Sequence, residues 1–238
     1  MCKRWAVALV LLSAAAGCLD DHLPVGVVPA DTSQGADARR EQLITNVRRR
    51  GGAVVRDDRA ADRPITSLDL HHFRDAVAAV DLLKPLPKLR ALNLYHTGFN
   101  DADLERLRDL AELQQLNLNA TAVTDAGLTR LTVLVKLQEL ELNDTAVSDA
   151  GLAVLAALPA LHALSLSGTA VTDDGVAQLR ALPALDKVWL GGPGISDRGL
   201  AHLKGCTRLR ELHLGRTRVT DAGVADLRKA LPCLVVVR

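Results

Sequence analysis

Aromatic residues are nearly absent from this chain of 238 residues, because Phe, Trp and Tyr together make up 2% of it. Its core must therefore be aliphatic. The chain also lacks an excess of either charge, with a net charge of +1. A nucleic-acid-binding surface needs clustered basic residues, so we expect no nucleic-acid partner. The hydrophobic share of 48% and the charged share of 24% are typical of a folded protein, and they argue against a disordered or collagen-like chain.

A long apolar run is also missing. The most apolar stretch is residues 5–12, and about a dozen apolar residues span only about 18 Å as a helix, too short for a bilayer core of about 30 Å. Lys3 and Arg4 precede this stretch, and small residues follow it at 14–17. This arrangement predicts that residues 1–17 are a secretory signal peptide.

Cysteines are few, and Cys18 stands directly after the predicted signal peptide. The string at 15–18 resembles the lipobox of bacterial lipoproteins, although Ala15 departs from the larger aliphatic residue usual there. The resemblance implies lipidation at Cys18 and attachment to a bacterial membrane through this anchor alone. The alternative is ordinary cleavage after residues 14–16, which leaves a secreted soluble protein. Residues 18–38 are polar, contain two prolines and read as a flexible tether.

Two further cysteines, Cys206 and Cys233, lie near the end of the chain. Cys206 occupies a position that elsewhere holds Leu, so we expect it to act as a small buried hydrophobic residue. A disulfide between the two is the alternative in an oxidising compartment.

Apolar residues recur at intervals of 24 residues, at Ile65, Leu89, Leu113, Leu137, Leu161, Leu185 and Leu209, and most units open with the pattern L-x-x-L-x-L. An eighth, partial unit begins at Leu234, one residue late. The pattern resembles the leucine-rich repeat family over residues 65–238. This resemblance implies an α/β solenoid, or horseshoe, with parallel strands on its concave face and helices on its convex face.

The spacing within each unit has a physical explanation. Leucines alternate with polar residues at the start of a unit, as in a strand with one buried face. Later apolar residues, such as Leu152, Leu155 and Leu158, have helical spacing. A single strand and helix cannot bury both apolar faces, so the units must stack into a continuous core.

The most regular segment is TAVTDAGL, residues 121–128, which returns with small changes at 145–152, 169–176 and 217–224. Thr124 or Asp125 is suited to cap the following helix, and Asp125 also suits the positive end of the helix dipole. Thr121 stands where many leucine-rich repeats have an asparagine that bonds neighbouring loops, so we expect its hydroxyl to make a smaller version of that contact. The segment is therefore predicted to be architecture.

Residues 39–64 differ from the repeats and are predicted to form an N-terminal cap. The stretch 40–50 reads as a helix that stops at Gly51 and Gly52, and 53–56 reads as a short strand. Terminal units of a solenoid need one polar face. The T-D-A-G-L form of the repeat also resembles arrays attached to eukaryotic F-box proteins, but nothing before residue 65 resembles an F-box.

Function is expected at the strand positions that vary between units, since their side chains face away from the core. We predict binding residues on this concave face at Tyr95, His96, Asn117, Asn119, Glu141, Asn143, Asp144, Trp189, His213 and Arg216. Trp189 has small neighbours, including Gly191 and Gly192, so it either lines a shallow pocket or folds over the gap that they leave. Large aromatic residues are favoured interface anchors.

Chemistry is not expected on this face. His72 and His96 occupy equivalent positions, but no carboxylate or cysteine clearly completes a metal shell. Ser67, Asp69 and His71 share a face in the wrong order for a triad, because the acid separates the serine from the histidine. We therefore predict no cofactor, no metal and no enzymatic activity. The favoured function is a protein-binding scaffold of the cell envelope with an unknown protein ligand. The alternatives are a binder of cell-wall polysaccharide and a spacer without a ligand.

Overall fold

The computed structural model describes residues 41–42, 44–49, 51–60, 62–71, 73 and 86–238. The predicted signal peptide, the predicted tether with Cys18, and His72 lie outside the described residues. The predictions made for them therefore stay predictions.

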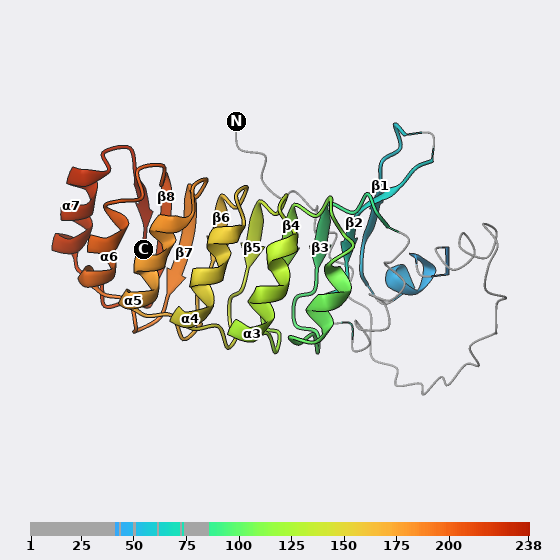
Figure 1. Cartoon of the computed structure of the whole chain (residues 1–238), viewed down its shortest axis with the longest axis horizontal. Helices are drawn as coiled ribbons and strands as arrows, with labels where there is room; N and C mark the ends of the chain where they lie inside the picture. The colour runs from blue at the N-terminus through green and yellow to red at the C-terminus, as the bar shows by residue number, and fades with distance from the viewer. Residues whose placement is uncertain (1–40, 43, 50, 61, 72, 74–85) are drawn as a thin grey trace.

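One nine-stranded sheet runs through the described chain, with its strands side by side in sequence order (Figure 1). Every pairing from β2 to β9 is parallel, and each links residues 24 apart, as in Leu92 with Leu116. The strands are β1 (Val54–Arg56), β2 (Ile65–Asp69), β3 (Ala91–Asn93), β4 (Gln115–Asn117), β5 (Glu139–Glu141), β6 (Ala163–Ser165), β7 (Lys187–Gly191), β8 (Glu211–Gly215) and β9 (Val235–Val237). The predicted parallel sheet of a repeat solenoid is confirmed.

Helical segments form a second layer in front of the sheet (Figure 1). In the middle units, a single α-helical turn continues directly into a 3-10 helix, a tighter form that rises about 2.0 Å per residue instead of about 1.5 Å. The segments are η1 (Asp103–Leu107), α3 (Asp125–Leu128), η2 (Thr129–Val133), α4 (Asp149–Leu152), η3 (Ala153–Ala157), α5 (Asp173–Val176), η4 (Ala177–Ala181), α6 (Asp197–Leu203) and α7 (Asp221–Ala230). The convex layer is thus only partly α-helical.

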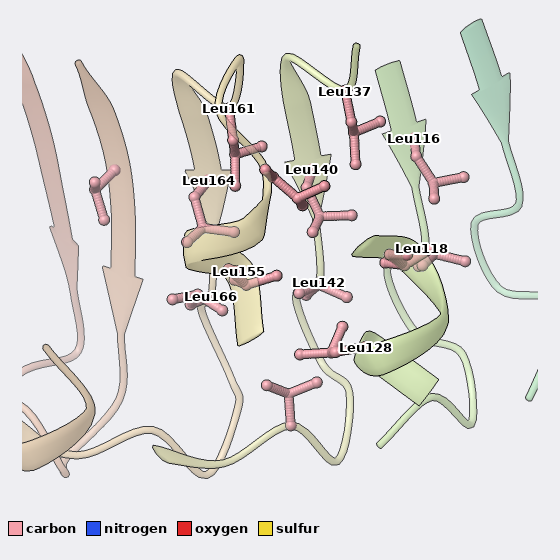
Figure 2. Packing of buried hydrophobic residues seen from close by; sticks show 14 of the residues in the cluster. Leu116, Leu118, Leu128, Leu137, Leu140, Leu142, Leu155, Leu161, Leu164 and Leu166 are labelled. Carbon is pink, nitrogen blue, oxygen red and sulfur yellow. The ribbon is translucent and has the colours of Figure 1, made fainter. Parts of the chain in front are cut away.

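The core is a continuous file of leucines between the two layers. Figure 2 shows Leu140 and Leu164 from the strands with Leu128 and Leu155 from the helical layer. These four side chains are at most 1% exposed. Since each unit places leucines at the same positions, neighbouring units bury one another's apolar faces, as the repeat pattern predicts.

One extra residue lies between Leu209 and Leu234, and the structure shows where it is absorbed. Leu234 is buried one residue later than the repeat would place it, yet β9 pairs Val235 with Glu211 at the usual interval of 24. Helix α7 has 10 residues, whereas α5 and η4, which fill the same stretch of their unit, have 4 and 5. Because an α-helix rises less per residue than a 3-10 helix, it uses more residues over the same length.

The chain before the first repeat contains a helix and a strand. Residues 44–49 are helical, as predicted, and Gly51 follows with a φ of +88°, a left-handed conformation favoured by glycine. Strand β1 pairs with β2 in the antiparallel sense, unlike all other neighbours in the sheet. The outer edge of β2, the first parallel strand, is therefore closed by the antiparallel strand β1 instead of by another repeat unit.

The recurring segment joins each unit to the next through its threonine or serine and its aspartate. Thr124 is the residue that caps the helix, since its side chain accepts a hydrogen bond from the backbone N–H of Ala126. The carboxylate of Asp125 instead accepts bonds from the backbone N–H and the hydroxyl of Ser148 in the following unit, at 2.7 and 2.5 Å. The same pair of bonds is made by each member of what we call the aspartate ladder: Asp101, Asp125, Asp149, Asp173 and Asp197.

The glycine of the segment is explained by this ladder. A Cβ atom on Gly175 would lie 2.1 Å from Oδ1 of Asp149, and Gly151 and Gly127 face the preceding aspartate in the same way. The glycine leaves room for a carboxylate from the unit before.

The expectation for Thr121 is wrong. Its hydroxyl donates to the carbonyl of Leu118 within its own unit, at 2.6 Å, instead of to a neighbouring loop. The equivalent threonines do the same, as Thr145 donates to the carbonyl of Leu142. The hydroxyl is buried, and the nearest carbonyl that satisfies it lies three residues back in the turn.

The two cysteines near the chain end are unpaired. Cys206 is buried, as its place in the leucine pattern predicts, and burial raises the pKa of its thiol. Cys233 is exposed. The alternative of a disulfide between them is not realised in this structure.

Candidate binding face

The face of the sheet turned away from the helices carries two rows of side chains within the strands. The first row starts the strands and includes Gln115, Glu139, Lys187, Glu211 and Val235, while the second includes Asn117, Glu141, Ser165, Trp189, His213 and Val237. Leucines between the rows point into the core. Five predicted site residues therefore lie on or directly beside these rows: Asn117, Glu141, Trp189 and His213 within the strands, and Asn119 two residues beyond β4.

A third set of predicted residues lies past the strand ends, at the edge of the face. His96, Asp144 and Arg216 are exposed and have φ values of 52°, 55° and 55°. These three residues occupy the same position of three different 24-residue units. Gly168 and Gly192 occupy this position in two other units and also have positive φ. The turn after each strand thus requires a left-handed residue, and these three side chains project from strained backbone at the rim.

Two asparagines predicted to bind a ligand hold neighbouring units together. Oδ1 of Asn119 accepts from the backbone N–H of Asn143 at 2.6 Å, and Oδ1 of Asn143 accepts from the N–H of Ser167 and the hydroxyl of Ser165, each at 2.7 Å. Asn117 accepts the N–H of Asn119 at 2.9 Å. Their side-chain oxygens therefore serve the architecture, and much of this asparagine row is already engaged.

Glu141 is a half-buried carboxylate in the middle of the face. The side-chain amide of Asn119 donates to its Oε2 at 2.6 Å. Burial raises the pKa of the Glu141 carboxyl, the bond from Asn119 opposes this, and the negative charge of Glu139 raises the pKa further. Ionised Glu141 is therefore held in an unfavourable electrostatic environment that a cation would relieve.

Trp189 and His213 form a stacked pair on adjacent strands. Their ring centroids are 5.0 Å apart and their planes differ by 13°. Glu211 holds the other edge of this pair, because Nε2 of His213 lies 2.7 Å from its Oε1. Nζ of Lys187 lies 3.4 Å from Oε2 of the same carboxylate. The contacts with His213 and then Lys187 hold the pKa of Glu211 below its usual range.

Tyr95 lies away from this pair. It is 39% exposed, and its ring tilts against that of His96 with centroids 5.9 Å apart. Four strand spacings separate β3 from β7, which corresponds to about 19 Å. Tyr95 and Trp189 therefore belong to different ends of the face, although the sequence placed both on it.

Two exposed valines on the face were missed by the sequence analysis. Val235 and Val237 on β9 are 58% and 43% exposed and lie in register with Glu211 and His213. The residue inserted before Leu234 obscured their phase in the repeat. Counting 24 residues forward from His213, instead of from the leucine, would have found them.

Neither a metal centre nor a membrane span is found in the part of the chain that the structure describes. Within that part, no cluster of three His, Cys, Asp or Glu side chains is arranged to hold a metal ion. Among the described helices, none is both long and apolar enough to cross a bilayer.

Comparison with known families and structures decides the class of protein. Residues 133–156 and 205–227 match the family model described as Leucine Rich repeat. The chain has the leucine-rich-repeat fold, and two of its units match that family. Internalin C2 from Listeria monocytogenes has a similar structure, with 23% sequence identity over 72% of this chain and 80% of that chain, and a TM-score of 0.53. At this identity the likeness shows the fold alone. No curated protein matches the chain.

Leucine-rich repeats are typical of protein-interaction scaffolds, and such a fold is typically a non-enzymatic one. In this protein, the residues that hold the fold together can now be distinguished from those of the variable face. The aspartate ladder and the leucines recur in every middle unit, whereas the residues of the two face rows differ from strand to strand.

Proposed function

We propose that the protein is a non-enzymatic scaffold of the cell envelope that holds a protein ligand on the concave face of its leucine-rich repeats. The main support is the concentration of large, variable and partly exposed side chains on β5 and β7–β9, where the aspartate ladder and core take no part. The half-buried carboxylate of Glu141 costs solvation unless a partner uses it. The partly exposed ring of Trp189, stacked on His213, offers an aromatic anchor.

The location in the envelope is proposed from the sequence of residues 1–18. A signal peptide at 1–17 followed by Cys18 supports export and lipid anchoring, with the ordinary secreted form as the alternative. Cys18→Ser tests this directly. We expect the variant to lose membrane association and to be processed differently; unchanged fractionation and processing would contradict the anchor.

The ligand is tested by capture from an envelope extract with the full chain as bait. Trp189→Ala, Tyr95→Ala and Arg180→Ala serve as parallel baits, the last being an exposed residue of η4 on the convex side. A partner held by the wild type and by Arg180→Ala but lost by Trp189→Ala supports the proposal. Equal retention by all four baits would move the binding site away from this face.

A polysaccharide ligand is the second candidate, and the Trp189–His213 stack is the observation that favours it. It is weakened by the asparagines, whose side-chain oxygens already accept bonds within the protein. Soluble cell-wall fragments at millimolar concentration should change the fluorescence of the wild type, with Trp189→Ala as the control. An unchanged spectrum would exclude this candidate.

A further inference from the structure

The C-terminal part of the concave face is an apolar surface next to an acidic one. We define the apolar patch as Trp189, His213, Val235 and Val237, which lie on three consecutive strands, β7 to β9. Val235 and Val237 are the two most exposed large hydrophobic side chains in the last repeat, at 58% and 43%. Exposed apolar side chains that gather on one face mark interaction sites more often than single ones do.

The acidic part lies two strands away, on β5. Glu139 and Glu141 are both on this face, and the charge of one raises the pKa of the other. Between the two parts, β6 contributes only Ala163 and Ser165, which are buried between larger neighbours. Strand β6 itself therefore places no large side chain between the two parts.

Lys187, the basic residue of β7, is engaged with Glu211 and not with Glu141. Lys187 on β7 is directed to Glu211, at 3.4 Å, and His213 bonds the same carboxylate. This group is close to balanced in charge, and the bond that Glu141 accepts comes from the neutral side-chain amide of Asn119. A partner must supply the positive charge there and an apolar group beside it.

We propose, on the basis of the protein-binding function above, that the partner contributes an extended segment that crosses the strands from β5 to β8, with a Lys or Arg side chain at Glu141 and a large apolar side chain on the apolar patch. The strand spacing sets the distance between the two. Glu141 lies about 10 Å from the row of Trp189 and about 14 Å from that of His213, counting two and three strand spacings. An extended chain advances about 3.3 Å per residue and points successive side chains to opposite faces, so a basic and an apolar residue that both face the sheet are four positions apart.

This chemistry selects a protein segment over other polymers. Neutral glycans supply no cation for Glu141, and nucleic acids bring negative charge toward β5. A Lys or Arg side chain gains the most from a carboxylate that is already partly desolvated. Tyr95, about 10 Å from β5 on the opposite side, takes no part in this segment.

The test is a selection of phage-displayed random 12-residue peptides on the full chain. We expect enriched peptides to share one basic and one large apolar residue four positions apart. A synthetic peptide of this kind should bind Glu141→Gln and Trp189→Ala at least tenfold more weakly, while Arg180→Ala, on the convex side, binds it as the wild type does. If Trp189→Ala folds poorly, Val237→Ser, at an exposed position of the apolar patch, tests the contribution of the patch to binding instead.

Replacement of the basic residue of the peptide by alanine completes the experiment. This peptide should bind the wild type and Glu141→Gln equally, since the ion pair is missing in both cases. Peptides that need Trp189 but carry no basic residue and ignore Glu141→Gln would overturn this inference and leave the protein-binding face intact. Peptides insensitive to every face variant would contradict the proposed function itself. A selection without enriched peptides would overturn the extended segment and leave a folded partner, which the capture experiment detects.

Discussion

At the scale of single residues, the recurring aspartate of one unit packs against the recurring glycine of the next. The carboxylate of Asp149 accepts two bonds from Thr172 and occupies the space that a side chain on Gly175 would need. Sequence reasoning assigned the threonine and aspartate to local capping. It could not find the second role, because the residues that Asp149 contacts lie 23 positions away in the next unit.

Gly175→Ala should destabilise the protein. In an ordinary helix the change from glycine to alanine is favourable by up to about 1 kcal/mol, but here the new methyl would lie 2.1 Å from Oδ1 of Asp149. Overpacking of this kind costs about 1–3 kcal/mol. Urea denaturation measures the difference. Gly98→Ala is the control, because nothing lies within 4 Å of its Cβ position; a loss as large in the control would contradict the explanation.

Glu141→Gln should stabilise the folded protein at neutral pH. The folded state raises the pKa of this carboxyl through burial and the charge of Glu139, so ionised Glu141 opposes folding above about pH 4.3, the value for an unperturbed Glu. The wild type gains stability relative to the variant as the pH falls and the carboxyl takes up its proton. Denaturation at pH 7 and pH 4 checks the sign. A less stable variant at pH 7 would contradict the assigned cause.

At the scale of the elements, adjacent units are joined by the aspartate ladder on the helix side and by asparagines at the strand ends. Both sets connect residues 22 to 24 positions apart. The repeat predicted the strands and their register, since leucine alternation fixes which face is buried. It did not predict the 3-10 helices, because one turn of α-helix and one of 3-10 helix bury the same apolar positions.

Asn143→Ala should cost about 1–2 kcal/mol, because its Oδ1 accepts both the N–H of Ser167 and the hydroxyl of Ser165. Asn143→Asp keeps an oxygen at this position and should cost less. The free energy of unfolding of the two variants tests this. Equal losses would show that the donor atoms of Asn143, and not its acceptor, hold the units together.

The last member of the aspartate ladder makes the C-terminal unit sensitive to acid. The backbone N–H of Thr220, and then its hydroxyl, lower the pKa of Asp197. A lowered folded pKa gives stability that is present above the unfolded value of about 3.9 and is lost as the pH falls through the folded value. Helix α7 should therefore lose hydrogen-exchange protection below about pH 4 in the wild type. Asp197→Asn should lack this pH-dependent component, and an identical pH profile in both would contradict it.

At the scale of the whole molecule, the chain is a linear stack in which each unit contacts its neighbours (Figure 1). This fold was predictable because each 24-residue unit has leucines at the same positions and therefore makes the same contacts with its neighbours. The candidate site was only partly predictable. The repeat correctly placed Trp189, His213 and Glu141 on one face. It could not show that the side-chain oxygens of Asn119 and Asn143 accept hydrogen bonds from neighbouring units. It also could not show that Val235 and Val237 extend the face.

The separation of architecture from binding face is tested most directly by one affinity measurement. It compares the dissociation constant of the captured partner for the wild type, Trp189→Ala and Gly175→Ala, at a temperature where all three are folded. We expect Trp189→Ala to weaken binding at least tenfold, about 1.4 kcal/mol, and Gly175→Ala to bind like the wild type despite its lower stability. Unchanged binding by Trp189→Ala, with a loss in Gly175→Ala, would contradict the account by placing the ligand on the helix side.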